Sequence, residues 1–180
     1  MDNEVSVDPR AKASQLSHLR LALPRQEEQK VTSMIEAKLV LTQSNDLSRQ
    51  FVATTGSGHH LILDDTLGGT GAGPIELVAI ALAGCAASDV MTYLRLKRHQ
   101  KVTGYELRVE ADQAETNPRV FTAIRMHHVI TGRDINAEAV RAAIRLCNAA
   151  HGAIEAMLRH TVSVVATFEI TPEKTVAGAA

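Results

Sequence analysis

Residues 73–90 read GPIELVAIALAGCAASDV, and this stretch decides the fold. Its proline suits the first turn of a helix, and nearly every position after it is apolar or small. The stretch therefore predicts a helix that begins at Pro74, runs to about His99 and is buried nearly all round. One sheet of the same chain would not cover such a helix. We therefore expect a second copy of the chain to cover the rest, as a homodimer.

Short strands are expected on both sides of this helix. Before it, alternating side chains and turn residues predict strands at 34–42, 49–55 and 60–63, and a glycine-rich loop follows at 68–73. After it, the sequence predicts two strands, a second helix and a final strand, at 106–111, 120–130, 136–158 and 162–170. This order predicts an α+β fold, with antiparallel sheets packed on two long helices.

The domain is expected to span residues 31–171. Residues 1–30 form an N-terminal extension, in which Leu16, Leu19 and Leu23 would line one face of a short helix. Residues 172–180 carry no pattern and are expected to be a flexible tail.

Composition excludes several classes of protein. The 180 residues carry a net charge of −1, and 3% of them are aromatic, which leaves no basic surface or stacking platform for nucleic acid. The N-terminus has no apolar run typical of a secretory signal, and the apolar stretch 75–87 is expected to be too short to cross a bilayer. We therefore expect a cytoplasmic protein without membrane contact.

The chain is also expected to hold no metal and no cofactor. Two cysteines are too few for a disulfide scaffold or a zinc site with four thiolates. The pairs His59–His60 and His127–His128 are neighbours on predicted strands, so the members of each pair face opposite sides. The loop 68–73 lacks both the P-loop ending and the GxGxxG pattern of nucleotide sites.

Cys85 lies among small residues in the middle of the first helix. A thiol in such surroundings is commonly a core residue. Asp89 follows four residues later, on the same helix face, and a carboxylate on an apolar helix needs a partner or water. Two interpretations of Cys85 therefore stay open, a packed core thiol and a thiol that meets a polar cleft.

Several segments together resemble the OsmC/Ohr family of osmotically inducible and organic hydroperoxide resistance proteins, and above all its YhfA-like branch. They lie at 73–77, 82–85, 88–90, 117–122, 131–135 and 142–158, and the resemblance covers residues 34–170. The resemblance implies an intertwined α+β homodimer with active sites at the subunit interface. It also implies reduction of organic hydroperoxides by a reactive cysteine that thiols recycle.

The resemblance assigns roles to individual residues. Cys85 matches the reactive cysteine, and Gly152 stands where the family has its second, resolving cysteine. Glu76 matches the glutamate of the YhfA-like pattern, and Arg49 is the nearest candidate for the arginine that stabilises the thiolate. His151, beside Gly152, would line the interface cleft.

Cys147 is the candidate second thiol. On one straight helix it would be turned ~140° from position 152 and displaced by ~7.5 Å along the axis. It would then belong to an apolar seam of Val140, Ile144, Cys147, His151, Ile154 and Leu158. We therefore expect Cys147 to be a packing residue, unless the helix is rotated or the pairing crosses subunits.

Two functions follow as alternatives. The first is thiol-dependent reduction of organic hydroperoxides through Cys85, with Asp89, Glu76 and Arg49 around it. An external thiol or lipoyl-type reductant would then reduce the sulfenic acid of Cys85, because position 152 carries no cysteine. The second is a non-catalytic dimer of the same fold that binds a small apolar ligand in the interface cleft.

Overall fold

The computed structural model describes residues 3–5, 34–45, 48–65, 69–147 and 152–173. The chain forms two compact units, residues 8–74 and residues 1–7 together with 75–180. We call them the hairpin unit and the helix unit. The predicted helix around Leu16, Leu19 and Leu23 lies outside the described residues. The domain boundaries expected from the sequence stay a prediction.

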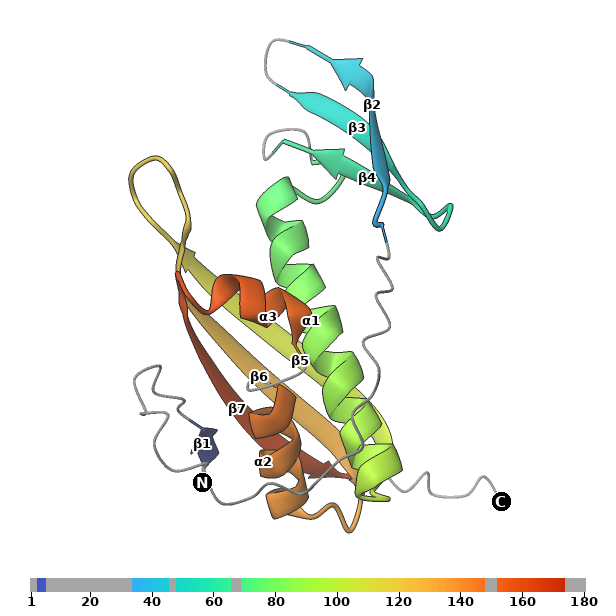
Figure 1. Cartoon of the computed structure of the whole chain (residues 1–180), viewed down its shortest axis with the longest axis vertical. Coiled ribbons are helices and arrows are strands. Elements are labelled where there is room, and N and C mark those ends of the chain that lie inside the picture. Colours follow the sequence, from blue (N-terminus) through green and yellow to red (C-terminus); the bar gives the residue numbers. More distant parts are fainter. Residues whose placement is uncertain (1–2, 6–33, 46–47, 66–68, 148–151, 174–180) are drawn as a thin grey trace, which may run out of the picture. The chain divides into compact units, whose positions relative to one another are not determined.

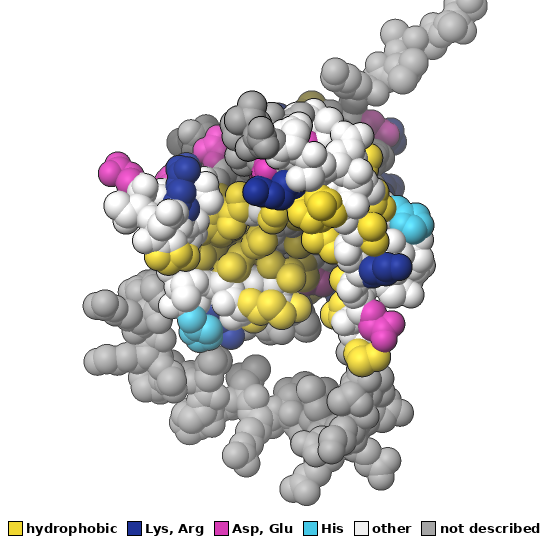
Figure 2. All heavy atoms as spheres, turned by 90° about the horizontal axis from the view of Figure 1, so that it is seen from above, with side chains coloured by type: hydrophobic (Ala, Val, Ile, Leu, Met, Phe, Trp, Pro, Cys, Tyr) yellow, Lys and Arg dark blue, Asp and Glu magenta, His cyan; other side chains and the backbone are white. Residues whose placement is uncertain are grey.

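The hairpin unit is a three-stranded antiparallel sheet in the order β2-β3-β4 (Figure 1). The strands are β2 (Ala37–Ser44), β3 (Arg49–Thr55) and β4 (His60–Asp64), which confirms the three strands expected before the helix. Large apolar side chains remain exposed on this sheet, among them Leu39 and Ile62, and hydrophobic side chains are open at the surface in Figure 2. Such apolar exposure is typical of a surface that another chain covers.

The helix unit packs its helices on one face of a four-stranded sheet, in the order β1-β7-β6-β5 (Figure 1). The strands are β1 (Asn3–Val5), β5 (Lys101–Gln113), β6 (Phe121–Arg133) and β7 (Ser163–Pro172). The helices are α1 (Pro74–Thr92), its π-helical continuation η1 (Tyr93–Lys97), α2 (Ala137–Leu146) and α3 (Ala153–Leu158). The first helix therefore confirms the expected start at Pro74 and an end close to His99.

Two expectations about this unit are wrong. β6 and β7 run parallel, because the helical segments between them return the chain to the same end of the sheet. β5–β6 is antiparallel as expected, and β1, a strand that the sequence did not predict, is antiparallel to β7. The second helix is not one long helix. Gly152 has an extended backbone, with φ −70° and ψ 94°, so α2 and α3 are separate helices.

The core lies between the helices and the sheet. Every second residue of β6 faces it, and Ile124, Met126 and Ile130 are each at most 1% exposed. One side of α1 joins this core, while Ile75 and Ile80 on the same helix are 36% and 59% exposed. Within one chain the sheet covers only one side of the helix, and the expected burial of the other side against a second copy stays a prediction.

The helical segment Pro74–Lys97 is longer than the apolar stretch 75–87, which was expected to be too short to cross a bilayer. Its 24 residues have a mean hydropathy of 1.7, so by length and composition alone the segment is long and apolar enough to cross a membrane. Four of its side chains instead pack into the core of the helix unit: Leu82, Ala86, Val90 and Leu94. The expected absence of membrane contact stays a prediction.

Asn136 fixes the start of α2. Its Oδ1 accepts a hydrogen bond from the backbone N–H of Ala139 at 3.0 Å, and its own N–H donates to Oε1 of Gln100. We expect Asn136→Ala to lower the free energy of unfolding by about 1 kcal/mol, because one N–H of the first turn loses its acceptor. Urea denaturation measures this difference. Asn136→Asp keeps an acceptor and is the control; equal losses in both variants would contradict the capping role.

Candidate active site

The two cysteines of the chain come from two helices of the helix unit, and both are free thiols. Cys85 is half-buried in the middle of α1, and Cys147 is the buried C-cap residue of α2. The Sγ atom of Cys147 lies 3.7 Å from the carbonyl oxygen of Ala86 and 3.7 Å from Oδ2 of Asp89. The Cys147 thiol therefore packs on the part of α1 that immediately follows Cys85.

Gly152 separates α2 from α3, on the C-terminal side of Cys147. The backbone N–H of Gly152 donates to the carbonyl oxygen of Cys147 at 3.1 Å, and Gly152 is the N-cap residue of α3. The angle of ~140° between positions 147 and 152 assumed one straight helix, and α2 and α3 are separate helices, so that angle does not apply. Val140, Ile144 and Cys147 are nevertheless buried, as expected for the first half of the apolar seam.

A side chain at position 152 would be crowded. A Cβ atom on Gly152 would lie 3.2 Å from Cβ of Glu155 and 3.3 Å from the carbonyl oxygen of Cys147. Both distances are shorter than ordinary van der Waals contact, so the surroundings would have to shift to accept a cysteine. The second thiol of this chain lies at the end of α2, and a cysteine at position 152 would need its neighbours to shift by a few tenths of an ångström.

Burial and negative charge keep Cys147 protonated. Burial raises its pKa to about 12, and Asp89 and Glu155 add to this effect because negative charges disfavour a thiolate. The thiol group of Cys85 contributes in the same direction. Burial likewise raises the pKa of Glu155, which is 6% exposed, while Arg159 lowers it.

Two side chains of the sheet also belong to the surroundings of Cys147: Tyr105 from β5 and His128 from β6. The hydroxyl of Tyr105 and Nδ1 of His128 form a hydrogen bond of 2.6 Å, and the buried Nε2 of His128 has no hydrogen-bond partner among the described residues. Burial lowers the pKa of His128 to about 4, and the neighbouring His127 adds to the shift, so the ring is neutral at pH 7. Burial raises the pKa of Tyr105, and the charge of Cys147 adds to this.

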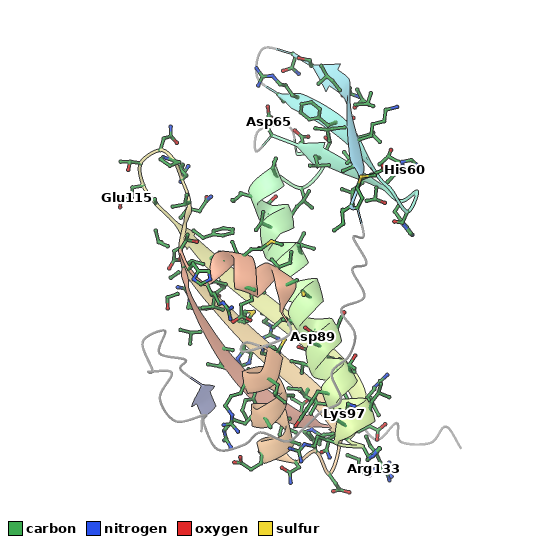
Figure 3. The ribbon with its side chains drawn as sticks, in the orientation of Figure 1. His60, Asp65, Asp89, Lys97, Glu115 and Arg133 are labelled. Atoms are coloured by element: carbon green, nitrogen blue, oxygen red, sulfur yellow. The ribbon has the colours of Figure 1, made fainter. Side chains whose placement is uncertain are left out.

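Asp89, near the C-terminal end of α1, is labelled in Figure 3 and marks the place of these side chains on that helix. We call these side chains the thiol cluster, which consists of Cys85, Asp89, Tyr105, His128, Cys147 and Glu155. The structure thus brings together three residues expected from the sequence, Cys85, Asp89 and Cys147.

The sequence also placed Glu76, Arg49 and His151 at the site. Glu76 is an exposed residue in the first turn of α1. Arg49 belongs to the hairpin unit, where its backbone N–H donates to Asp65 at 3.0 Å and its guanidinium lies 3.8 Å from the same carboxylate. The roles of Glu76 and Arg49 toward Cys85 stay predictions. His151 lies outside the described residues.

Three members of the thiol cluster were missed by sequence reasoning: Tyr105, His128 and Glu155. The signal for His128 was its spacing with Ile124, Met126 and Ile130, which places a polar ring on the apolar face of β6. No comparable signal marked Glu155, which becomes buried only because the helix restarts after Gly152. Tyr105 lies one residue before the predicted strand 106–111, so its place on a face of the sheet was not predicted.

The described part of the chain holds no group of three or more His, Cys, Asp or Glu side chains placed to bind a metal ion. Pockets of about 510 and 290 Å³ lie elsewhere, one lined by β2 and β3 and the other at the start of α2. The first includes Lys38 and Thr54, and the second includes Arg98 and Asn136. Neither pocket is lined by a cysteine, so the candidate site is defined by the two thiols and not by a pocket.

Comparison with known proteins identifies the family. The family described as OsmC-like protein matches residues 67–167. Protein YhfA of Escherichia coli (strain K12) is 32% identical over 120 residues, which are 67% of this chain and 89% of that protein. The chain belongs to the OsmC-like family. The expected resemblance, including that to the YhfA-like branch, is therefore confirmed.

Solved structures of OsmC-like proteins have the same fold. The OsmC-like protein from Mycoplasma pneumoniae matches with a TM-score of 0.63 and 12% identity, over 78% of this chain and 98% of that chain. The organic hydroperoxide resistance protein OsmC from Legionella pneumophila matches with a TM-score of 0.55 and 18% identity, over 80% and 99%. At these identities the likeness confirms the α+β fold of the family.

Proposed function

We propose that this OsmC-like protein reduces organic hydroperoxides with Cys85 as the nucleophile. The Cys85 thiolate attacks one peroxide oxygen, the O–O bond breaks, and the leaving alkoxide takes a proton to become an alcohol. Cys85 is left as a sulfenic acid, which two thiol groups of an external thiol or lipoyl-type reductant return to the thiol, with release of water and a disulfide. The observation that carries this proposal is the half-buried Cys85, on the α1 turn beside Asp89 and the second thiol.

The active form is proposed to be a homodimer. Ile75 and Ile80 leave one side of α1 exposed, and Leu39 and Ile62 are exposed on the sheet of the hairpin unit. Burial of apolar area is favourable by about 25 cal/mol per Å², so a second copy that covers these side chains would stabilise the pair. In this dimer Arg49 and Glu76 are proposed to approach Cys85 of the same or the other subunit.

The partners proposed for this dimer are a small hydroperoxide and a thiol reductant in the cytoplasm. Nucleic acid is not among them, because the net charge of −1 supplies no excess of basic residues. No membrane partner is proposed either, since one side of the apolar α1 already packs into the core of the chain.

The alternative is a dimer that binds a small apolar ligand and does no chemistry. Gly152, in place of the family's second cysteine, favours this alternative, and so does the exposed apolar side of α1 with Ile75 and Ile80. An apolar ligand would then be held by these side chains, and Cys85 would be a packing residue.

Multiple turnover separates the two functions. We expect the reduced full chain to consume many equivalents of cumene hydroperoxide when dithiothreitol is present in excess, because each cycle restores Cys85. Loss of the hydroperoxide, followed by a peroxide-specific colour reaction and corrected for the reaction with dithiothreitol alone, measures the rate. Consumption of one equivalent or less per chain would contradict the peroxidase and favour the ligand-binding dimer.

A further inference from the structure

Basic side chains gather at the C-terminal end of the first helix, and the reduction of peroxides by Cys85 makes no use of them. Between Asp89 and Glu106 the sequence has four basic residues and no acidic residue. All four are exposed, on η1, directly after it and at the start of β5. Figure 3 shows Lys97 and Arg133 at the same end of the helix unit. We call this surface the basic strip, and it consists of Arg95, Lys97, Arg98, Lys101 and Arg133.

The structure holds two of these charges in place. The Arg95 guanidinium donates to the carbonyl oxygen of Val102 at 2.9 Å. Nε of Arg98 donates to the hydroxyl of Tyr93 at 3.0 Å, and the guanidinium carbon lies 5.4 Å from the centre of the same ring. In the described part of the chain, the four basic residues of η1 and β5 form no ion pair with an acidic side chain. Their charges are therefore positioned but not neutralised.

Folding does not explain this arrangement. Lys101 and Arg133 stand opposite each other on the antiparallel strands β5 and β6, and like charges in that position destabilise a sheet. Three acidic residues border the strip. The carboxylate of Glu173 lies 3.3 Å from the Arg133 guanidinium, Asp134 follows in the next turn, and Glu138 is bonded to another arginine. The strip itself keeps an excess of positive charge, which an acidic partner would offset.

A protein with an acidic surface fits the strip better than nucleic acid or a lipid surface. The ring of Tyr93 is half-buried and lies under Arg98, so it does not offer a base a platform for stacking. Leu96, between the charges, is 68% exposed, and burial of one leucine contributes only about 1.5–3 kcal/mol, which is little for attachment to a bilayer. An apolar side chain surrounded by charged ones is typical of a protein–protein interface.

We propose that the basic strip docks the acidic surface of a protein that supplies the reducing thiols to Cys85. Cys85 and Arg95 lie ten residues apart on one continuous helical segment, which separates them by about 15 Å along its axis. A protein held on the strip therefore brings its thiols close to the sulfenic acid, and opposite charge raises the rate of encounter. This inference rests on the proposed function and adds the class of reductant, while the chemistry at Cys85 stays the same.

Two synthetic dithiol peptides test the preference for negative charge. Each carries two cysteines, placed among glutamates in one peptide and among lysines in the other, and each replaces dithiothreitol during the turnover of cumene hydroperoxide. At low ionic strength we expect about a tenfold higher kcat/KM for the glutamate peptide, because the strip attracts it. The preference should disappear at about 1 M NaCl, where the Debye length is about 3 Å. A glutamate peptide with serines in place of the cysteines should bind in a salt-dependent manner, measured by fluorescence anisotropy.

Lys97→Glu and Lys101→Glu each reverse one charge of the strip, and Arg119→Glu is the matched control. Arg119 is exposed at the other end of β5 and β6, about 40 Å from Lys101 along the strands. Both strip variants should lose most of the preference for the glutamate peptide, while the control keeps it. All three should keep the oxidation of Cys85 by the first equivalent of peroxide. Lys101→Glu places opposite charges across from Arg133, so urea denaturation should show no loss of stability in this variant.

The outcomes separate the inference from the proposed function. Turnover with dithiothreitol, together with equal kcat/KM values for the two peptides, would overturn the inference and leave the peroxidase standing. Tighter binding of a DNA duplex or of phosphatidylglycerol vesicles than of the serine-containing glutamate peptide would also overturn it. No turnover with any of the three reductants would overturn the proposed function, and the inference with it.

Discussion

Cys85→Ser is expected to reduce the turnover of organic hydroperoxide by at least about a thousandfold, because a hydroxyl group does not replace a thiolate as the nucleophile. The substitution removes one sulfur atom from a half-buried position of α1, where small residues surround it. The fold should therefore remain, and the loss should be chemical. Cumene hydroperoxide consumption with excess dithiothreitol measures it, and circular dichroism checks that the helices persist.

Cys147→Ser is the matched control, because it also exchanges one sulfur of the thiol cluster for oxygen. This variant is expected to keep the oxidation of Cys85 by the first equivalent of peroxide, since the proposed nucleophile is unchanged. A Cys85→Ser chain that still turns over peroxide at the wild-type rate would exclude Cys85 as the nucleophile. A Cys147→Ser chain that no longer reacts with the first equivalent of peroxide would indicate that Cys147, and not Cys85, is the nucleophile.

The second large effect is on stability in acid. His128 is 1% exposed and its pKa falls to about 4 from 6.5, because burial disfavours the charged ring and the neighbouring His127 repels it. The folded state thus prefers the neutral ring. Its contribution to stability is fully present above pH 6.5 and is lost as the pH falls from 6.5 toward 4.

The pKa difference corresponds to about 3 kcal/mol of unfolding free energy across this interval. Urea denaturation at a series of pH values from 7.5 to about 4 measures the loss. His128→Gln keeps a polar partner for Tyr105 but does not titrate, so its stability should fall much less over the same interval. An identical pH dependence in the variant and the wild type would show that other groups cause the acid destabilisation.

Much of the fold followed from local sequence patterns. The proline and the apolar run after it define the start of α1, and alternating side chains define the strands on both sides of it. These signals are local, because backbone geometry and the spacing of apolar residues act over a few positions. Family membership likewise followed from short motifs around Cys85 and in the later segments.

The site was only partly predictable. Cys85 and Asp89 share one helix, so their spacing alone placed them together. Cys147 was expected to point away, because the argument assumed a continuous helix from 136 to 158. The backbone at Gly152 is extended, so the helix is not continuous there. The contact of Cys147 with Asp89 depends on how α2 packs against α1, which the sequence pattern does not report.

The sequence by itself determined which residue is the candidate nucleophile, since Cys85 is fixed by its motif and by the helix that carries it. The tertiary structure decided what surrounds it. Tyr105, His128 and Glu155 reach the thiol cluster from two strands and a third helix, far apart in sequence. The burial of these three side chains and the effect of Glu155 on Cys147 arise from packing between these elements, because desolvation and charge act through space, whereas sequence patterns report only neighbours along the chain.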